Sequence, residues 1–280
     1  MRLLAADIGN TNTGVGLFDD AVMVGAWQAE TDSQATEDEL AAMLTGLLAL
    51  DGHRLEGLDA AALACVVPAL VPTWRRMLTR RAGVEPVVVD AAGLGGVLAI
   101  EIDRPAEAGA DRLVNALAAR QEFGGPAIVV DLGTSTNFDV VSAEGAYLGG
   151  AIAPGLGISV DALVGRAAKL PRVELRRPPR AIGTNTVHAM QSGTVNGYIG
   201  LLSGLLAALR GELVERSPAD ARVTVVATGG FSLQPWLAEV PGIDRVEPEL
   251  TLRGIRYAYE HITTRTGARA GVAEADGSPG

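Results

Sequence analysis

Residues 128–139 read IVVDLGTSTNFD, and residues 4–13 read LAADIGNTNT. Both stretches run from apolar residues into an aspartate, one more apolar residue, a glycine, and then short hydroxyl or amide side chains. The apolar run predicts a buried strand, and the glycine with its polar neighbours predicts a tight turn directly after it. The aspartates, Asp7 and Asp131, stand 124 positions apart, so each half of the chain carries one copy of this pattern.

A second strand follows each turn and leads into a hairpin. The first hairpin is expected to turn at Asp19-Asp20 and the second near Glu144-Gly145. An Asp-x-Gly turn is common, and either copy alone needs no special explanation. Matched hairpins behind both copies indicate internal duplication, so the sequence predicts two copies of one α/β unit.

The remaining elements support this division. A capping box formed by Thr36 and Glu39 opens the first helix, in which leucines recur at helical spacing. The expected elements are helices over 37–49, 71–83, 109–124, 158–170, 189–210 and 252–264, and strands within 59–68, 85–90 and 222–230. We therefore expect an N-terminal domain over 1–118, a C-terminal domain over 119–265, and a flexible tail over 266–280.

Composition excludes several classes of protein. A formal charge of −10 argues against a nucleic-acid surface, which presents basic patches to phosphates. The single cysteine, Cys65, lies in an apolar run and is expected to be an inert core residue. No signal peptide precedes Asp7, and the apolar runs fall short of the ~20 residues of a membrane helix. These features predict a cytoplasmic protein that contacts no membrane.

The repeated turn suits phosphate chemistry. Backbone N–H groups of such a turn form a concave anion site, and the hydroxyl side chains add donors. The aspartate supplies a hard oxygen ligand for Mg²⁺, which also keeps waters and phosphate oxygens. Two such turns facing across a cleft would clamp a nucleotide triphosphate, and phosphoryl transfer depends mainly on such positioning and charge neutralisation.

Other nucleotide and metal signatures are missing from the sequence. The chain has one lysine, Lys169, without the glycine pattern of a P-loop, and no Gly-x-Gly-x-x-Gly follows a strand. His53, His188 and His261 show no ligand spacing and are expected to be surface residues.

The chain resembles the actin, sugar-kinase and Hsp70 ATPase superfamily, with two ribonuclease-H-like domains facing across a nucleotide cleft, and within it the type III pantothenate kinases. The resemblance covers roughly residues 2–258, and the motifs occur in the family's order. The matching motifs are DIGNTNTGVGLF (7–18), VVP (66–68), GADR (109–112), DLGTSTNFD (131–139), GGAIAPG (149–155), AAKLPRVEL (167–175), IGTNTVHAMQSG (182–193), TGG (228–230) and LTLRG (250–254).

This resemblance implies an ATP-dependent kinase that phosphorylates pantothenate to 4′-phosphopantothenate, the first step of coenzyme A biosynthesis. It implies ATP and Mg²⁺, a monovalent cation (K⁺ or NH₄⁺), and a homodimer. ATP would be bound by Asp7, Ile8, Gly9, Asn10, Thr11, Asn12, Thr13 and Thr134, with Asp7 directed towards Mg²⁺. Asp131 would bind the monovalent cation. Pantothenate would contact Ile102, Gly109, Ala110, Asp111, Arg112 and, from the partner subunit, Thr186.

Asp111 is the implied general base. A carboxylate can accept the proton of an attacking alcohol, and Arg112 suits the carboxylate of pantothenate. Local sequence alone favours a simpler interpretation, in which Asp111 caps the helix that starts at Arg112. Both roles are compatible, and the surrounding motifs favour the base.

Two features leave alternatives open. Gly193, Gly197, Gly200 and Gly204 recur along a predicted helix, so another helix can approach closely, either at a dimer interface or inside one subunit. Ile102 stands where the family usually has a tyrosine that encloses pantothenate. The alternatives for function are therefore a kinase of another small hydroxylated substrate, or a catalytically weak paralogue with a regulatory role.

Overall fold

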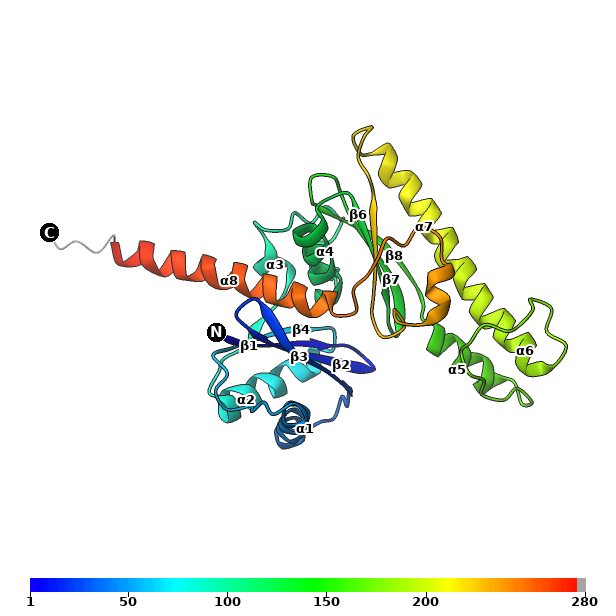
Figure 1. Ribbon diagram of the computed structural model, residues 1–280. Helices are drawn as coiled ribbons and strands as arrows, with labels where there is room; N and C mark the ends of the chain where they lie inside the picture. Colours follow the sequence, from blue (N-terminus) through cyan, green and yellow to red (C-terminus); the bar gives the residue numbers. More distant parts are fainter. Residues whose placement is uncertain (276–280) are drawn as a thin grey trace. The chain divides into compact units, whose positions relative to one another are not determined.

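The computed structural model describes the backbone of residues 1–275 and the side chains of residues 1–265 (Figure 1). The chain divides into two units. The first unit contains Met1–Ala118 together with the chain from Thr251 onward, and the second contains Ala119–Leu250. Each unit is built around one five-stranded sheet.

The first sheet has the order β3-β2-β1-β4-β5. Its strands are β1 (Arg2–Ile8), β2 (Asn12–Asp19), β3 (Val22–Glu30), β4 (Ala60–Cys65) and β5 (Val87–Val88). The strands β1, β2 and β3 form an antiparallel meander, whereas β4 and β5 run parallel to β1. Because β1 is central and apolar on both faces, helices must cover both sides of this sheet.

Helices of the first unit meet that requirement. They are α1 (Glu37–Leu50), α2 (Val71–Ala82) and α3 (Ala91–Leu94), together with most of α4 (Ala110–Phe123) and of α8 (Leu250–Ala275). The helix α4 passes into the second unit after Ala118, and α8 enters the first unit at Thr251. The helices α1 and α2 lie on one side of the sheet, where Leu44 and Trp74 enter a core with Leu4 and Leu63 (Figure 1). Thr36 and Glu39 form the expected capping box at the start of α1.

The second sheet has the order β10-β9-β6-β7-β8. Its strands are β6 (Ala127–Leu132), β7 (Ser135–Val141), β8 (Tyr147–Pro154), β9 (Thr224–Thr228) and β10 (Arg245–Val246). Its helices are α5 (Leu156–Arg166), α6 (Thr186–Gln191) and α7 (Gly197–Glu215), and a π turn over Ser192–Asn196 joins α6 to α7. Single 3₁₀ turns occur at Pro68–Leu70, Pro105–Glu107 and Pro235–Glu239.

The two sheets share one topology. In both, the first three strands form a meander, and the next two add parallel to the first strand. Each meander also carries a bulge in its second strand pair, close to the hairpin that joins the two strands, at Leu17/Phe18 and at Val140/Val141. The duplication predicted from the repeated turn is therefore present in the backbone.

The last helix differs from the expectation in both place and length. Residues 251–265 were expected in the second domain, but α8 packs within the first unit. Thr251 Oγ1 donates to Asn115 Oδ1 at 2.8 Å, and Leu252 lies against Gly16. The helix was expected to give way to a tail near residue 266, yet it continues to Ala275, and residues 276–280 lie outside the described part of the chain.

The helical stretch Thr186–Glu215 also departs from the expectation that apolar runs are too short for a membrane. By length and a mean hydropathy of 1.3 it passes that test, although only 22% of the tested window is buried in the chain. A core helix of a soluble protein passes the same test. Tyr198, Leu202 and Leu206 of this stretch pack into the core of the second unit.

Candidate functional site

The first turn connects β1 to β2. The Gly9 amide donates to the Asn12 carbonyl at 3.1 Å, and a Cβ on Gly9 would lie only 2.8 Å from that oxygen. Thr13 is buried, and its hydroxyl lies 2.7 Å from that of Thr31. Asn10, Thr11 and Asn12 are exposed, so the turn presents polar groups at the end of the sheet.

The second turn connects β6 to β7 in the same way but is one residue shorter. Ile8 pairs with Thr13 across the first turn, whereas Leu132 pairs with Thr136 across the second. The Gly133 amide donates to the Ser135 carbonyl at 3.0 Å. Thr134 at the tip is exposed, and Asp131 is half-buried on the strand before it.

Two glycines pack closely against the second turn. A Cβ on Gly155 would overlap the carbonyls of Gly133 and Thr134, and the Gly155 amide donates to the Thr134 carbonyl at 3.2 Å. Gly229, with φ +86°, has its Cα against the Asp131 carboxylate. The GGAIAPG and TGG motifs are thus required for packing at this turn, and their contact with a nucleotide stays a prediction.

Sequence reasoning missed two side chains that hold this turn. The Tyr198 hydroxyl lies 2.5 Å from Thr136 Oγ1, and both residues are buried. Burial raises the pKa of Tyr198, so the phenol stays neutral. Because 62 positions separate Tyr198 from Thr136, no local pattern reveals this pair.

Asp111 lies inside the first turn of α4, which begins at Ala110 rather than at Arg112. Its Oδ1 accepts the Arg112 amide at 2.8 Å, so the carboxylate does serve the helix end locally. Burial raises the pKa of Asp111, and the nearby Arg112 opposes that shift. A half-buried carboxylate whose proton affinity is increased by desolvation is a recognised mark of acid–base function.

Backbone contacts connect the GADR motif to the end of β1. The Val66 amide donates to the Ile8 carbonyl at 3.0 Å, and a Cβ on Gly109 would lie 3.5 Å from Val66 Cγ1. The VVP motif therefore lies between the first turn and the start of α4. The predicted ATP turn and the predicted base belong to one unit, in which Ile102 is half-buried before the 3₁₀ turn that precedes Gly109.

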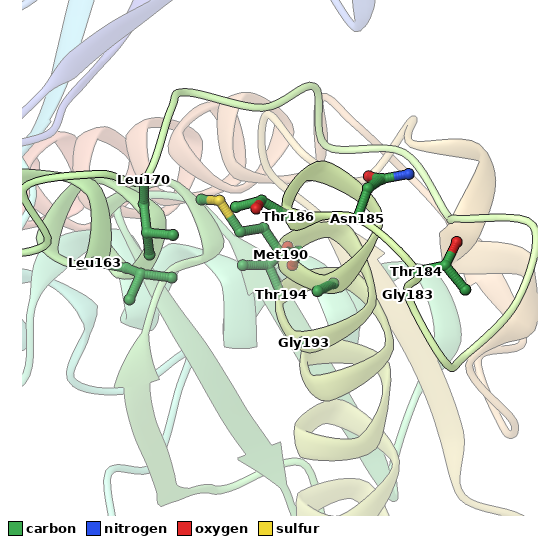
Figure 2. A pocket seen from close by; sticks show the side chains of 10 residues that line it. Leu163, Leu170, Gly183, Thr184, Asn185, Thr186, Met190, Gly193 and Thr194 are labelled. Carbon is green, nitrogen blue, oxygen red and sulfur yellow. The ribbon is translucent and has the colours of Figure 1, made fainter.

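Thr186 lies in the second unit, at a groove of about 750 Å³ (Figure 2). The groove lies between α5, the loop after it and α6, and its lining includes Leu163, Asn185, Thr186 and Met190. Asn185 caps α6 by accepting the His188 amide at 2.9 Å, which leaves the exposed Thr186 as the first residue of the helix.

No group of three or more His, Cys, Asp or Glu side chains suitable for a metal occurs among the described residues. Any metal here would therefore depend on one or two carboxylates together with phosphate oxygens and water, which is how Mg²⁺ is usually held. Cys65 is partly buried and donates to the Val67 carbonyl, and burial raises the pKa of its thiol. This environment agrees with an inert cysteine.

Solved structures support the predicted fold. The chain superimposes with a TM-score of 0.55 on a conserved putative Baf family transcriptional activator from Campylobacter jejuni, at 16% identity over 93% of this chain and 99% of that one. It superimposes with a TM-score of 0.53 on the activator of 2-hydroxyisocaproyl-CoA dehydratase from Clostridium difficile with bound ADPNP, at 14% identity over 96% and 98%. The expectation of two duplicated actin-like domains is confirmed.

Sequence relatives are much more similar. A type III pantothenate kinase from Moorella thermoacetica is 46% identical over 93% of this chain and 100% of its own length. Another from Roseiflexus sp. strain RS-1 is 46% identical over 92% and 98%. The family model described as Type III pantothenate kinase matches residues 3–208. This chain therefore belongs to the type III pantothenate kinase family.

Proposed function

We propose that this chain transfers the γ-phosphoryl group of ATP to the terminal hydroxyl of pantothenate, giving 4′-phosphopantothenate and ADP. The observation that carries the proposal is Asp111, a desolvated carboxylate beside an arginine at the start of α4. Gly109, two residues before it, lies beside Val66, whose amide donates to the Ile8 carbonyl at the end of β1.

Asp111 would act as the general base. The pantothenate hydroxyl oxygen forms a bond to the γ-phosphorus, the bond from that phosphorus to the bridging oxygen breaks, and ADP leaves. The hydroxyl proton passes to the Asp111 carboxylate as the new bond forms. A carboxylate whose pKa is raised is a stronger proton acceptor than an ordinary aspartate, which favours this role at neutral pH.

Arg112 would bind the carboxylate of pantothenate. Its guanidinium is always charged and matches a carboxylate with two parallel hydrogen bonds. Arg112 directly follows Asp111 in the sequence, so neighbouring residues would recognise the carboxylate and the reacting hydroxyl of pantothenate. The substitution of Ile102 for the family's usual tyrosine bears on pocket shape and leaves these charged groups in place.

ATP would be held by the first turn, Asp7–Thr13, and by Thr134 of the second. The donor set fits Mg²⁺, because Asp7 is a half-buried carboxylate next to a polar turn. The metal would neutralise phosphate charge, and Asp7 would orient it through phosphate oxygens or water. For Asp131 we propose a monovalent cation, since its carboxylate lies against the Gly229 backbone, where a larger residue would not fit.

We also propose that the chain forms a homodimer. Among the described residues, a Cβ on any of Gly193, Gly197, Gly200 and Gly204 would meet nothing within 4 Å, so this stripe packs against no helix of its own subunit. Exposed apolar side chains also occur on α5 and on and before α6, at Ile158, Leu163, Ile182 and Val187. We propose that a second copy covers this face, and that Thr186 contacts pantothenate bound to the partner. Such a dimer would work in the cytoplasm, without nucleic acid or membrane.

The alternative of an inactive regulatory paralogue is disfavoured by the sequence itself, since Asp7, Asp111 and Asp131 are all present. A coupled assay of ADP release tests the proposal, with pantothenate compared against a panel of sugars and hydroxy acids. We expect release with pantothenate and background release with the other acceptors. Turnover of a sugar in place of pantothenate would assign a different substrate, and no turnover with any acceptor would favour the regulatory alternative.

A further inference from the structure

We propose that Tyr198 is a positioning residue for nucleotide binding. Its hydroxyl would hold the second turn, through Thr136, in the form that contacts the phosphates of ATP. This inference rests on the proposed function, because it assigns to Thr134 the role of an ATP ligand.

The direction of each hydrogen bond in this network follows from its members. Thr136 Oγ1 donates to the Pro154 carbonyl at 3.4 Å, so it has its lone pairs available towards Tyr198. The Tyr198 hydroxyl therefore donates to Thr136 Oγ1, across 2.5 Å. The hydroxyl of Tyr198 in α7 thus holds the first residues of β7, and Thr136 in turn binds the Pro154 carbonyl just before α5.

This network lies directly behind the proposed phosphate contact. Thr136 is the residue that closes the second turn by pairing with Leu132. Leu156 directly follows Gly155, whose amide holds the Thr134 carbonyl at 3.2 Å. The carbonyl of Thr134 and the strand after it are thereby tied to the same end of α5. Removal of the Tyr198 hydroxyl would take away the hydrogen bond to Thr136 and leave the Gly155–Thr134 bond alone to hold this side of the turn.

Burial makes the hydroxyl necessary. Thr136 is fully buried, Tyr198 is 5% exposed and Leu156 is 1% exposed, so water has little access to replace a lost partner. The Tyr198 ring itself packs edge-to-face on Trp236, with ring centroids 5.6 Å apart. Phenylalanine keeps that packing and leaves Thr136 Oγ1 without its buried Tyr198 partner, which is accommodated most easily by movement of the turn.

The test compares Tyr198→Phe with a matched control, Tyr147→Phe. Tyr147 is also fully buried in the second unit, and its hydroxyl donates to Asp139 Oδ1 at 3.3 Å, but it lies at the opposite end of β8 from the turn. For Tyr198→Phe we expect the Kd and KM for ATP to rise about threefold to tenfold, the effect of one hydrogen bond. The KM for pantothenate should stay within twofold, and Tyr147→Phe should keep the parental KM for ATP.

Thr136 provides an independent pair of variants. Thr136→Val should weaken ATP binding as Tyr198→Phe does, whereas Thr136→Ser, which keeps the hydroxyl, should restore it. This pair also serves if Tyr198→Phe proves insoluble. Parental ATP affinity in both Tyr198→Phe and Thr136→Val would overturn the inference, and so would an equal loss in Tyr147→Phe, since that would indicate general destabilisation. A parent enzyme that binds no ATP would contradict the proposed function itself, and it is measured separately.

Discussion

The carboxylate of Asp111 lies where a side chain on Gly109 would be, so any side chain at position 109 would collide with it. The carboxylate folds back over the start of α4 to accept the Arg112 amide, and only glycine leaves room for it there. The glycine of the GADR motif thus sets the orientation of the proposed base.

Gly109→Ala should therefore reduce catalysis by moving Asp111. We expect a loss of about 10²-fold in kcat, the cost of a misplacement near 1 Å, with ATP binding retained. Steady-state kinetics and ATP titration measure both quantities. Gly46→Ala in α1 is the control, because a Cβ there meets nothing within 4 Å and alanine favours a helix interior, so activity should be parental. Parental kcat for Gly109→Ala would remove the steric argument.

Asp111→Asn should abolish turnover, by ~10²–10⁴-fold, and at the same time stabilise the fold at neutral pH. Burial raises the pKa of Asp111, so the folded state binds its proton more readily than the unfolded state does. The stability of the parent should therefore decrease as pH rises through the folded pKa, and the cost is fully present above it.

Thermal unfolding across pH checks this sign. The gain in Tm of Asp111→Asn over the parent should be largest at neutral pH and should shrink as pH falls towards the ordinary range of aspartate. The parent's kcat/KM should fall on the acid side as Asp111 becomes protonated. A variant that is less stable than the parent at neutral pH would contradict the burial argument.

Gly200→Leu should dissociate the proposed dimer. A leucine on the open glycine stripe would hold a second helix away, while its own subunit offers no obstacle within 4 Å. Sedimentation velocity should show a monomer, and the loss of the partner's Thr186 should lower activity towards pantothenate. Gly46→Leu, at an equally open position on α1, should remain a dimer with parental activity.

Replacement of K⁺ by Na⁺ in the assay should depress activity if Asp131 binds the monovalent cation. Asp131→Asn should lower activity in K⁺ and remove most of the difference between the two salts. Assays at matched ionic strength separate this effect from general screening. Equal parental rates in both salts would reject the cation role of Asp131.

Ile102→Tyr should tighten pantothenate binding, since it restores the side chain that the family usually places there. We expect a lower KM for pantothenate and an unchanged KM for ATP, measured under steady-state conditions. Unchanged or weaker binding of pantothenate would indicate that residue 102 lies outside the substrate pocket.

Much of the fold was predictable because its signals are local. The apolar runs, the glycine turns at both aspartates and the capping box at Thr36 and Glu39 each determine structure within a few residues, and all are present. The short edge strand β10 and the placement of α8 were not predictable to the same degree, whereas β5 lies inside the predicted strand over 85–90. Pairing of Thr251 with Asn115 joins positions 136 residues apart, and no local pattern encodes such a contact.

The candidate site shows the same division. The motif residues were found because they cluster in sequence, at 7–13, 109–112 and 131–134. The predicted helix over 109–124 agrees with α4 to within one residue at each end, and Asp111 lies inside its first turn rather than before the helix. Tyr198 and Thr136 were missed because their partnership arises only when α7 packs beneath the second sheet.

The difference of one residue in length between the two turns can be used in protein engineering. In each sheet the bulge begins four residues after the threonine that closes the turn, Thr13 or Thr136. The extra residue of the first turn is therefore confined to the loop and leaves the strand pairing unchanged. The two loops are thus exchangeable segments between strands of the same sheet topology. Chimeras carrying two long or two short loops would separate what loop length contributes to nucleotide recognition from what the scaffold contributes.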